Sequence, residues 1–208
     1  MIGFLNDASS DASRLGAFRE GLVNLAMSKI KIFEFRWAEG RYDQLPIMAA
    51  ELVHRQVAVI AASATPSAVA AKGATSTIPI IFAVGGDPVK FGLVKSLARP
   101  DGNATGVNFF TVAVGQKRLG LLHELVTKGA VIGFLANPSN PNTPRDTEEA
   151  QEAAEQLGQA EIDAAFATLV QANVGGLVVD ADAFFHAATR SNHDSSRSSR
   201  NSCNSSKQ

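Results

Sequence analysis

The sequence lacks most of the residues that would indicate disulfides, metal binding or membrane insertion. Its single cysteine, Cys203, excludes an internal disulfide and a cysteine-based metal site. The four histidines, His54, His123, His186 and His193, show no metal-ligand spacing. No apolar run approaches the roughly 20 residues of a membrane span. A formal net charge of −1 gives no electrostatic reason to expect nucleic acid or an anionic membrane as partner.

Signals for catalysis, nucleotide binding and secretion are missing as well. The glycine pair in Gly85–Pro88 matches neither the dinucleotide fingerprint nor the phosphate loop with its lysine. No Gly-x-Ser-x-Gly elbow is present. We therefore expect no enzyme and no cofactor, and we predict binding rather than catalysis. The apolar start, Met1–Leu5, is too short for a secretory signal and has no basic leader, so the chain as written would stay in the cytoplasm.

What the sequence does contain is an alternation of strand and helix patterns, which predicts an α/β fold with a parallel sheet and helices on both faces. A hydrophobic content of 45% and a charged content of 19% fit a globular chain. Strands are expected at residues 2–5, 30–37, 57–62, 80–84, 131–136 and 176–179, and a short apolar run covers 105–110. Helices are expected around residues 15–25, 45–53, 114–126 and 160–171, and after Thr65 and Thr143.

Two of these helices carry start signals. Asp43 is a candidate N-cap for the helix over 45–53, and Thr65-Pro66 has the N-cap and N1 preferences of the next one. Asp146, Glu148 and Glu149 fall in the first turns of the helix after Thr143, where the helix dipole favours acidic residues.

The alternation breaks in the second half of the chain, where no strand separates Gly158 from the helix at 160–171. Residues 1–108 are predicted to form a first lobe and residues 109–185 a partial second lobe. From residue 186 to 208 the sequence has no large aliphatic residue and is rich in Ser, Asn and Arg. Such a segment cannot bury enough apolar surface to offset its ordering entropy, so we predict a disordered tail.

Small polar residues follow the predicted strands at the edge where open α/β sheets bind ligands. The best candidate anion site is Ser63-Ala64-Thr65-Pro66, because a helix amino-terminus offers free N–H groups there. Asp87 can accept an ammonium group, a charge-assisted bond. The remaining candidates at such strand ends are Asn6, Ser9, Gly86, Asn137, Asn140 and Asp180. Each of these positions is also explained by a turn or a helix cap without a ligand.

Four stretches of the sequence resemble the periplasmic solute-binding proteins of ABC-type uptake systems, in the branch related to tryptophan- and tyrosine-binding receptors. They are Ile2–Asn6 with Ala17–Leu22, then Glu34–Gly40, Ile78–Val89 and Arg99–Val107. Each is weak alone, and together they are quite specific. The resemblance implies a type I periplasmic-binding-protein fold, in which two α/β lobes close on a ligand and the chain crosses between them near 105–110.

The resemblance also implies partners and a location. The ligand would be an amino acid or another small organic acid, the protein partner an ABC permease, and the location periplasmic or membrane-anchored outside the cytoplasm. This sequence departs from the family in having no leader, no strand between Gly158 and Ala160, and the polar tail after Phe185. Exposed second-lobe surface would then favour self-association.

Three other interpretations remain open at this point. One is a truncated relic with little ligand affinity, in which a frameshift produced the tail; a natural disordered tail is the alternative. Another is a small flavodoxin-like α/β enzyme, which would need a phosphate loop or a nucleophile–base pair. The third is the effector domain of a transcription regulator, which would need a DNA-binding helix pair before Met1.

Overall fold

The computed structural model describes most of residues 1–182. The described residues are 1–8, 16, 20, 21, 33–109, 111–126, 131–156, 174–180 and 182, of which 111–113, 116 and 156 are described by their backbone only. Ser9, most of the helix predicted at 15–25, the helix predicted at 160–171, Cys203 and the predicted tail lie outside these residues. Among the described helices, none is long and apolar enough to cross a membrane.

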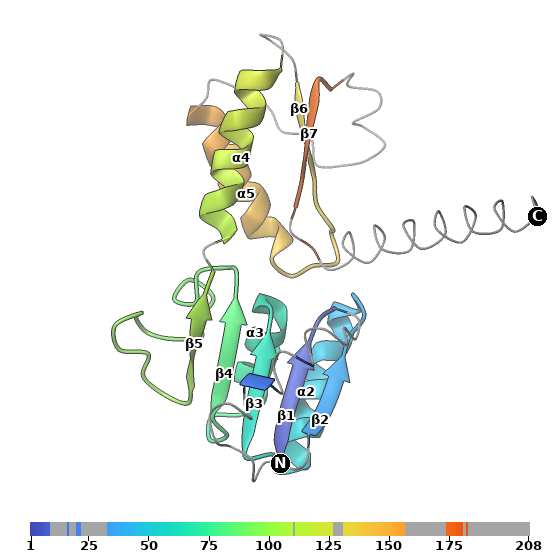
Figure 1. Ribbon diagram of the computed structural model, residues 1–208, viewed down its shortest axis with the longest axis vertical. Coiled ribbons are helices and arrows are strands. Elements are labelled where there is room, and N and C mark those ends of the chain that lie inside the picture. Colours follow the sequence, from blue (N-terminus) through green and yellow to red (C-terminus); the bar gives the residue numbers. More distant parts are fainter. Residues whose placement is uncertain are drawn as a thin grey trace, which may run out of the picture.

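The first lobe is built on a five-stranded parallel sheet in the order β2-β1-β3-β4-β5 (Figure 1). All five strands end at the edge that faces the second lobe (Figure 1). The strands are β1 (Ile2–Asn6), β2 (Phe33–Trp37), β3 (Val59–Ser63), β4 (Ile80–Val84) and β5 (Ala104–Asn108). The polar residues that follow the strands are therefore gathered between the lobes, as the sequence predicted.

Two helices pack side by side on the first sheet. They are α2 (Leu45–His54) and α3 (Thr65–Ala74), and a short 3-10 helix, η1 (Tyr42–Gln44), precedes α2. Leu5, Leu52 and Ile60 are fully buried in the core between these layers. Burying a side chain of this size contributes about 1.5–3 kcal/mol, so the first lobe has a core of its own.

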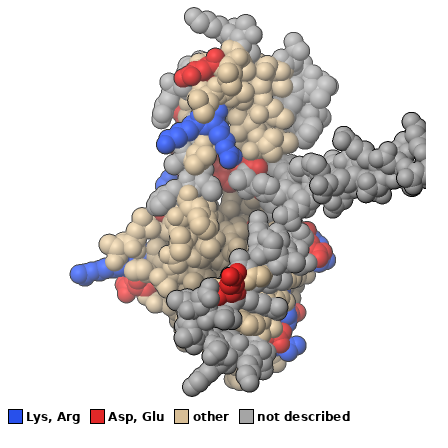
Figure 2. All heavy atoms as spheres, viewed as in Figure 1, with Lys and Arg blue, Asp and Glu red and all other residues tan. Residues whose placement is uncertain are grey.

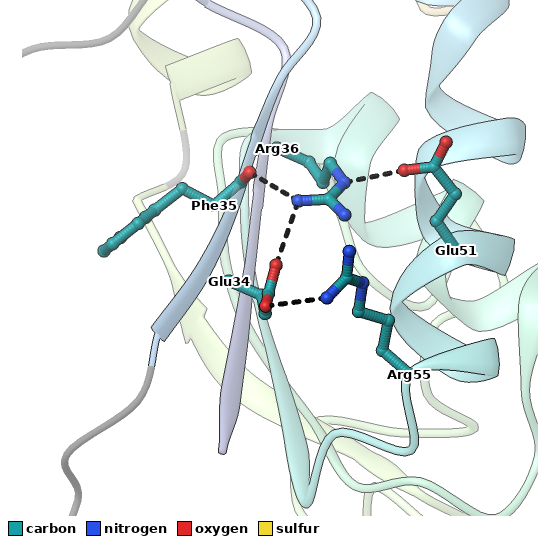
Figure 3. A network of polar contacts seen from close by, with 5 residues as sticks. All are labelled: Glu34, Phe35, Arg36, Glu51 and Arg55. Atoms are coloured by element: carbon teal, nitrogen blue, oxygen red, sulfur yellow. Dashed lines mark hydrogen bonds and ion pairs between the residues drawn. The ribbon is translucent and has the colours of Figure 1, made fainter.

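Ion pairs between charged side chains connect edge strand β2 to α2 (Figure 3). Arg36 Nε donates to Glu51 Oε2 at 2.7 Å, and Arg55 Nη1 donates to Glu34 Oε1 at 3.2 Å. Arg36 Nη1 also contacts Glu34 Oε2 at 3.3 Å, which joins the two pairs into one network. Exposed pairs of this kind contribute little each, so the network serves mainly to orient β2.

Aromatic rings line the same strand on the other face of its backbone pleat. Phe35 stacks on Phe33 and on Trp37, with ring centroids 5.9 and 6.3 Å apart. Phe4 of β1 approaches Trp37 at 5.2 Å between centroids. The three β2 aromatics therefore pack against one another and against β1 at the edge of the sheet.

The second lobe contains a two-stranded parallel sheet with two helices packed together (Figure 1). Its elements are α4 (Thr111–Leu125), β6 (Ile132–Leu135), α5 (Thr143–Gln156) and β7 (Gly176–Val179). Leu119, Ile132 and Ala154 form the centre of its small core. In the described residues, the chain passes from the first lobe to the second once, between β5 and α4.

The structure confirms the predicted strands at 80–84 and 176–179, and the described ends of the other predicted strands lie within two residues of the prediction. The predicted start at residue 30 lies outside the described residues. Both predicted N-caps are wrong. Gln44, not Asp43, precedes α2, and Pro46 at its second position has no N–H for a cap to bind. Ala64, not Thr65, precedes α3, because the Thr65 hydroxyl accepts the Gly86 N–H at 3.2 Å instead.

Candidate functional site

A cavity of about 550 Å³ lies between the two lobes. This volume is in the range of small-molecule sites, which is about 300–1,000 Å³. The cavity walls come from the strand ends of the first lobe and from α4, α5 and the strand ends of the second. Figure 2 shows acidic side chains where the two lobes meet, directly below basic side chains of the second lobe. The cavity is therefore the candidate functional site.

The first-lobe wall is the turn from β3 into α3 together with the loop after β4. Ser63, Ala64, Thr65 and Pro66 all line the cavity. The first N–H groups of a helix have no acceptor inside it, and Pro66 has no N–H, which leaves the amides of Thr65 and Ser67 as the donors of this turn. Helix amino-termini of this kind bind carboxylates.

Gly86 of this wall lies directly against the aromatic ring of Phe91. A Cβ built on Gly86 would lie 2.6 Å from Phe91 Cε2, so only glycine lets the ring of Phe91 lie where it does. Phe91 and Phe109 line the cavity from the first lobe, and Phe134 lines it from β6 of the second. Three phenylalanines facing one cavity suit a ligand with an apolar or flat side chain.

Ala64 holds a backbone conformation that favours glycine, with φ 77° and ψ 152°. Such a residue stores on the order of 1–3 kcal/mol of strain, which glycine would relieve, and the greater freedom of glycine in the unfolded state cancels only part of that gain. We predict that Ala64→Gly raises the free energy of unfolding by about 1 kcal/mol. Urea unfolding of the two proteins measures this difference. Equal or lower stability of the variant would contradict the strained geometry of this turn.

The second-lobe wall carries most of the charge. Asp146 and Glu149 of α5 line the cavity with Asp180, which follows β7, while Arg118 of α4 is an exposed guanidinium at its border. Glu149 Oε1 already accepts the Lys90 ammonium at 3.1 Å. The wall thus offers carboxylates for an ammonium group and a guanidinium for a carboxylate.

Asp146 has an unusual protonation equilibrium. Burial raises the pKa of its carboxyl from 3.8 to about 7, and the nearby carboxylates of Asp180, Glu149 and Asp182 act in the same direction. The guanidinium of Arg145 partly opposes them. A cation placed beside this carboxyl group would lower its pKa, because the cation stabilises the charged form. Perturbed groups in a cleft are typical of functional sites.

Of the predicted site residues, the cavity brings together the four of the α3 turn, Gly86, Asn140 and Asp180. Asn6, Asp87 and Asn137 are not among the lining residues. The Asn6 side chain accepts the Ala8 N–H at 2.7 Å, and Asp87 Oδ1 accepts the Val89 N–H at 2.8 Å. Both bonds are typical of turn residues. We therefore do not place the ammonium group of a ligand at Asp87, where the sequence suggested it.

Sequence reasoning missed several residues that line the cavity, among them Asp7, Phe91, Arg118, Asp146 and Glu149. A signal for two of them was present, because Asp146 and Glu149 stand in the first turns of a helix that begins at a strand end. That position was interpreted only as favourable to the helix dipole. Within the part of the chain that the structure describes, no group of three or more acidic, histidine or cysteine side chains is arranged to hold a metal ion.

Residues 1–184 match the family described as ABC transporter substrate binding protein. The chain belongs to this family. The match covers both lobes and therefore includes every described residue of the cavity.

Individual relatives agree with the family. A tyrosine-binding protein of Clostridioides difficile (strain R20291) is 39% identical over 110 residues, which are 53% of this chain and 31% of that protein. The structure of an ABC domain from Streptococcus pneumoniae in complex with L-Trp is similar with 27% identity and a TM-score of 0.69, over 87% of this chain and 65% of that one. This chain therefore spans about a third of the first relative and under two thirds of the second.

The fold is shared more widely. A leucine binding protein from Thermotoga maritima is 12% identical with a TM-score of 0.58, over 86% of this chain and 55% of that chain. At this identity only the architecture is comparable. The parallel sheets covered by helices are those of the periplasmic-binding-protein type, as the resemblance implied.

Proposed function

We propose that this chain is the ligand-binding component of an ABC-type uptake system, and that it captures an amino acid or a similar small organic acid between its lobes. The observation that carries this proposal is the cavity of about 550 Å³, whose walls offer an anion site, carboxylates and aromatic rings. Membership of a substrate-binding family supports the same function.

Each group of an amino acid has a matching part of the cavity. The carboxylate fits the amino-terminus of α3 or the guanidinium of Arg118. The ammonium group fits Asp146 and Asp180 on the opposite wall. An apolar or aromatic side chain fits the space beside the phenylalanines. The tyrosine-binding relative and the L-Trp complex are consistent with an aromatic amino acid as ligand.

Partners and location follow as further proposals. The permease partner and a location outside the cytoplasm rest on the family.

Self-association through the second lobe is supported by exposed apolar side chains on α4, where Leu121 is 61% and Leu125 83% exposed. Analytical ultracentrifugation of the chain and of a Leu121→Ser, Leu125→Ser variant tests this: an oligomer that the variant loses supports the proposal, and a monomeric parent chain contradicts it.

The test of the ligand proposal is thermal unfolding of the chain against a panel of amino acids and small organic acids. A ligand at a hundred times its dissociation constant stabilises the folded state by about 2.7 kcal/mol. We expect an aromatic amino acid to raise the unfolding temperature in a concentration-dependent way. The shift should be lost in Ala150→Trp, which places an indole in the cavity.

Ile47→Trp is the matched control, because Ile47 lies on α2, is 56% exposed and does not line the cavity. It should keep the full ligand shift. A chain that unfolds cooperatively and that no member of the panel stabilises would contradict the binding proposal and favour the interpretation as a relic.

A further inference from the structure

The two lobes meet at a buried hydrogen bond that is not part of the cavity wall. Tyr42 Oη of the first lobe donates to Asp182 Oδ2 of the second at 2.9 Å. Tyr42 is 7% exposed and Asp182 is 1% exposed. Neither residue is among those that line the cavity. A carboxylate this deeply buried requires hydrogen-bond donors, and one of its donors comes from the other lobe.

Asp182 also has donors within its own lobe. Asn140 Nδ2 donates to Oδ2 at 2.7 Å, and Asn137 Nδ2 donates to Oδ1 at 3.3 Å. Both asparagines follow β6, so these bonds do not cross between the lobes. If the lobes moved apart, Asp182 would keep the asparagines and exchange the Tyr42 hydroxyl for water. The Tyr42 bond therefore contributes to the closed arrangement and not to the fold of either lobe.

The Tyr42 hydroxyl is also held rigidly. Tyr42 belongs to the buried core cluster of the first lobe, which also contains Leu45 and Ala38. A hydroxyl fixed in this way loses little freedom when it donates to the second lobe, so more of the bond energy remains for closure. The hydroxyl thus serves as a preformed contact point for the second lobe.

Other polar contacts between described residues of the two lobes are more exposed. Lys90 Nζ pairs with Glu149 at 3.1 Å with 51% of the lysine side chain exposed. The Arg145 guanidinium donates to the Lys90 carbonyl at 3.3 Å and lies 5.2 Å from the centre of the Phe91 ring. Exposed ion pairs contribute little, whereas a buried bond to a carboxylate contributes more. Of these contacts between described residues, the Tyr42–Asp182 bond is therefore the one expected to influence closure most.

We propose that Tyr42 and Asp182 are positioning residues, whose hydrogen bond holds the lobes closed and so sets the affinity of the cavity without contacting the ligand. The inference rests on the proposed function only where it concerns affinity. The apparent dissociation constant rises as the closed, binding-competent fraction falls. Loss of a bond to a buried carboxylate lowers the closed-to-open ratio by roughly tenfold.

The first test measures lobe closure without a ligand. Spin labels are attached at Leu97→Cys in the first lobe and Leu125→Cys in the second, both exposed, in a Cys203→Ser background. Double electron–electron resonance spectroscopy then gives the distribution of distances between the two spin labels. We expect a single distance in the parent chain and a second, longer one in Tyr42→Phe, which keeps the ring in its core. Asp182→Asn should give the same longer distance.

Glu51→Gln is the matched control, since it weakens the Arg36–Glu51 pair, which lies within the first lobe (Figure 3). It should leave the distance distribution unchanged. The inference is overturned if Tyr42→Phe and Asp182→Asn both fold, by circular dichroism, and both give the distribution of this control.

The second test measures affinity for L-tryptophan by calorimetry. Tyr42→Phe should weaken binding by the same factor by which the closed fraction falls in the distance distributions, at most about tenfold, and the double variant Tyr42→Phe, Asp182→Asn should be no weaker than Asp182→Asn alone. Additive losses would contradict coupling through one bond. A parent chain that does not bind L-tryptophan contradicts the ligand proposal, whereas the distance distributions still decide the inference about closure.

Discussion

Gly106→Ala is expected to lower the free energy of unfolding by about 3 kcal/mol. Gly106 lies in β5 opposite Phe82 of β4. A Cβ built on Gly106 would overlap the backbone carbonyl oxygen of Phe82 and lie 2.6 Å from Phe82 Cδ2. A carbonyl within a sheet cannot move aside as a flexible side chain can. The alanine must therefore push β5 away from β4, with loss of ladder hydrogen bonds.

Urea unfolding followed by circular dichroism measures this effect. Gly73→Ala is the matched control, because a Cβ at Gly73 on α3 meets no atom within 4 Å. Alanine there should raise stability by about 0.5 kcal/mol through its higher helix propensity. If Gly106→Ala were as stable as the parent chain, the register that sets Gly106 against Phe82 would be wrong.

The same variant connects the fold to the site. β5 is followed by Phe109, which lines the cavity, and then by α4 of the second lobe. Displacing β5 therefore moves an aromatic wall and the single described passage between the lobes. We expect any Gly106→Ala protein that remains folded to bind ligand more weakly than the parent chain.

The sequence predicted β1, β3 and β4 of the first lobe well because they are short runs of mostly apolar residues bounded by turn residues. The strand over 80–84, for example, lies between Pro79 and Gly85. Part of the candidate site was predictable for a related reason, since residues after parallel strands meet at one edge. Ser63–Pro66, Asn140 and Asp180 were found in this way.

The rest of the site depends on tertiary packing. Arg118 lies in the middle of α4 and Asp146 near the start of α5, and nothing in the local sequence says which side of either helix faces the other lobe. The turn signal at Asp87 was similarly ambiguous, because an Asp before Pro either binds a ligand or caps a turn. The Tyr42–Asp182 bond joins residues 140 positions apart, and periodicity carries no information about such a pair.

Asp146 gives the second large effect that we expect, a dependence of ligand affinity on pH. Its pKa of about 7 means that the carboxyl of the ligand-free protein is mostly protonated below that pH. An ammonium group bound beside it requires the carboxylate, so binding must release the proton at low pH. Affinity for an ammonium-bearing ligand should therefore fall by about tenfold per pH unit below 7, or about a hundredfold between pH 7.5 and 5.

The stability of the ligand-free protein depends on pH in the opposite direction to ligand affinity, because the Asp146 contribution decreases as pH rises. Between the unfolded pKa near 3.8 and the folded pKa near 7, the folded state binds more protons than the unfolded state. The contribution of Asp146 is therefore favourable at pH 4 relative to pH 8, and it is lost as pH rises through about 7. Burial and the carboxylates of Asp180, Glu149 and Asp182 oppose ionisation, while Arg145 favours it.

Asp146→Asn separates these two effects. The variant should be more stable than the parent chain at pH 8, where the parent must keep a buried charge among three other carboxylates, and should bind an aromatic amino acid with an affinity nearly independent of pH. Calorimetric titrations at pH 5, 6, 7 and 8 measure the second property.

Glu148→Gln is the control, because Glu148 is an exposed carboxylate of α5 that does not line the cavity. This variant should leave the pH profile of ligand affinity unchanged. A pH profile that Asp146→Asn also leaves unchanged would exclude this carboxyl from the site of the ammonium group.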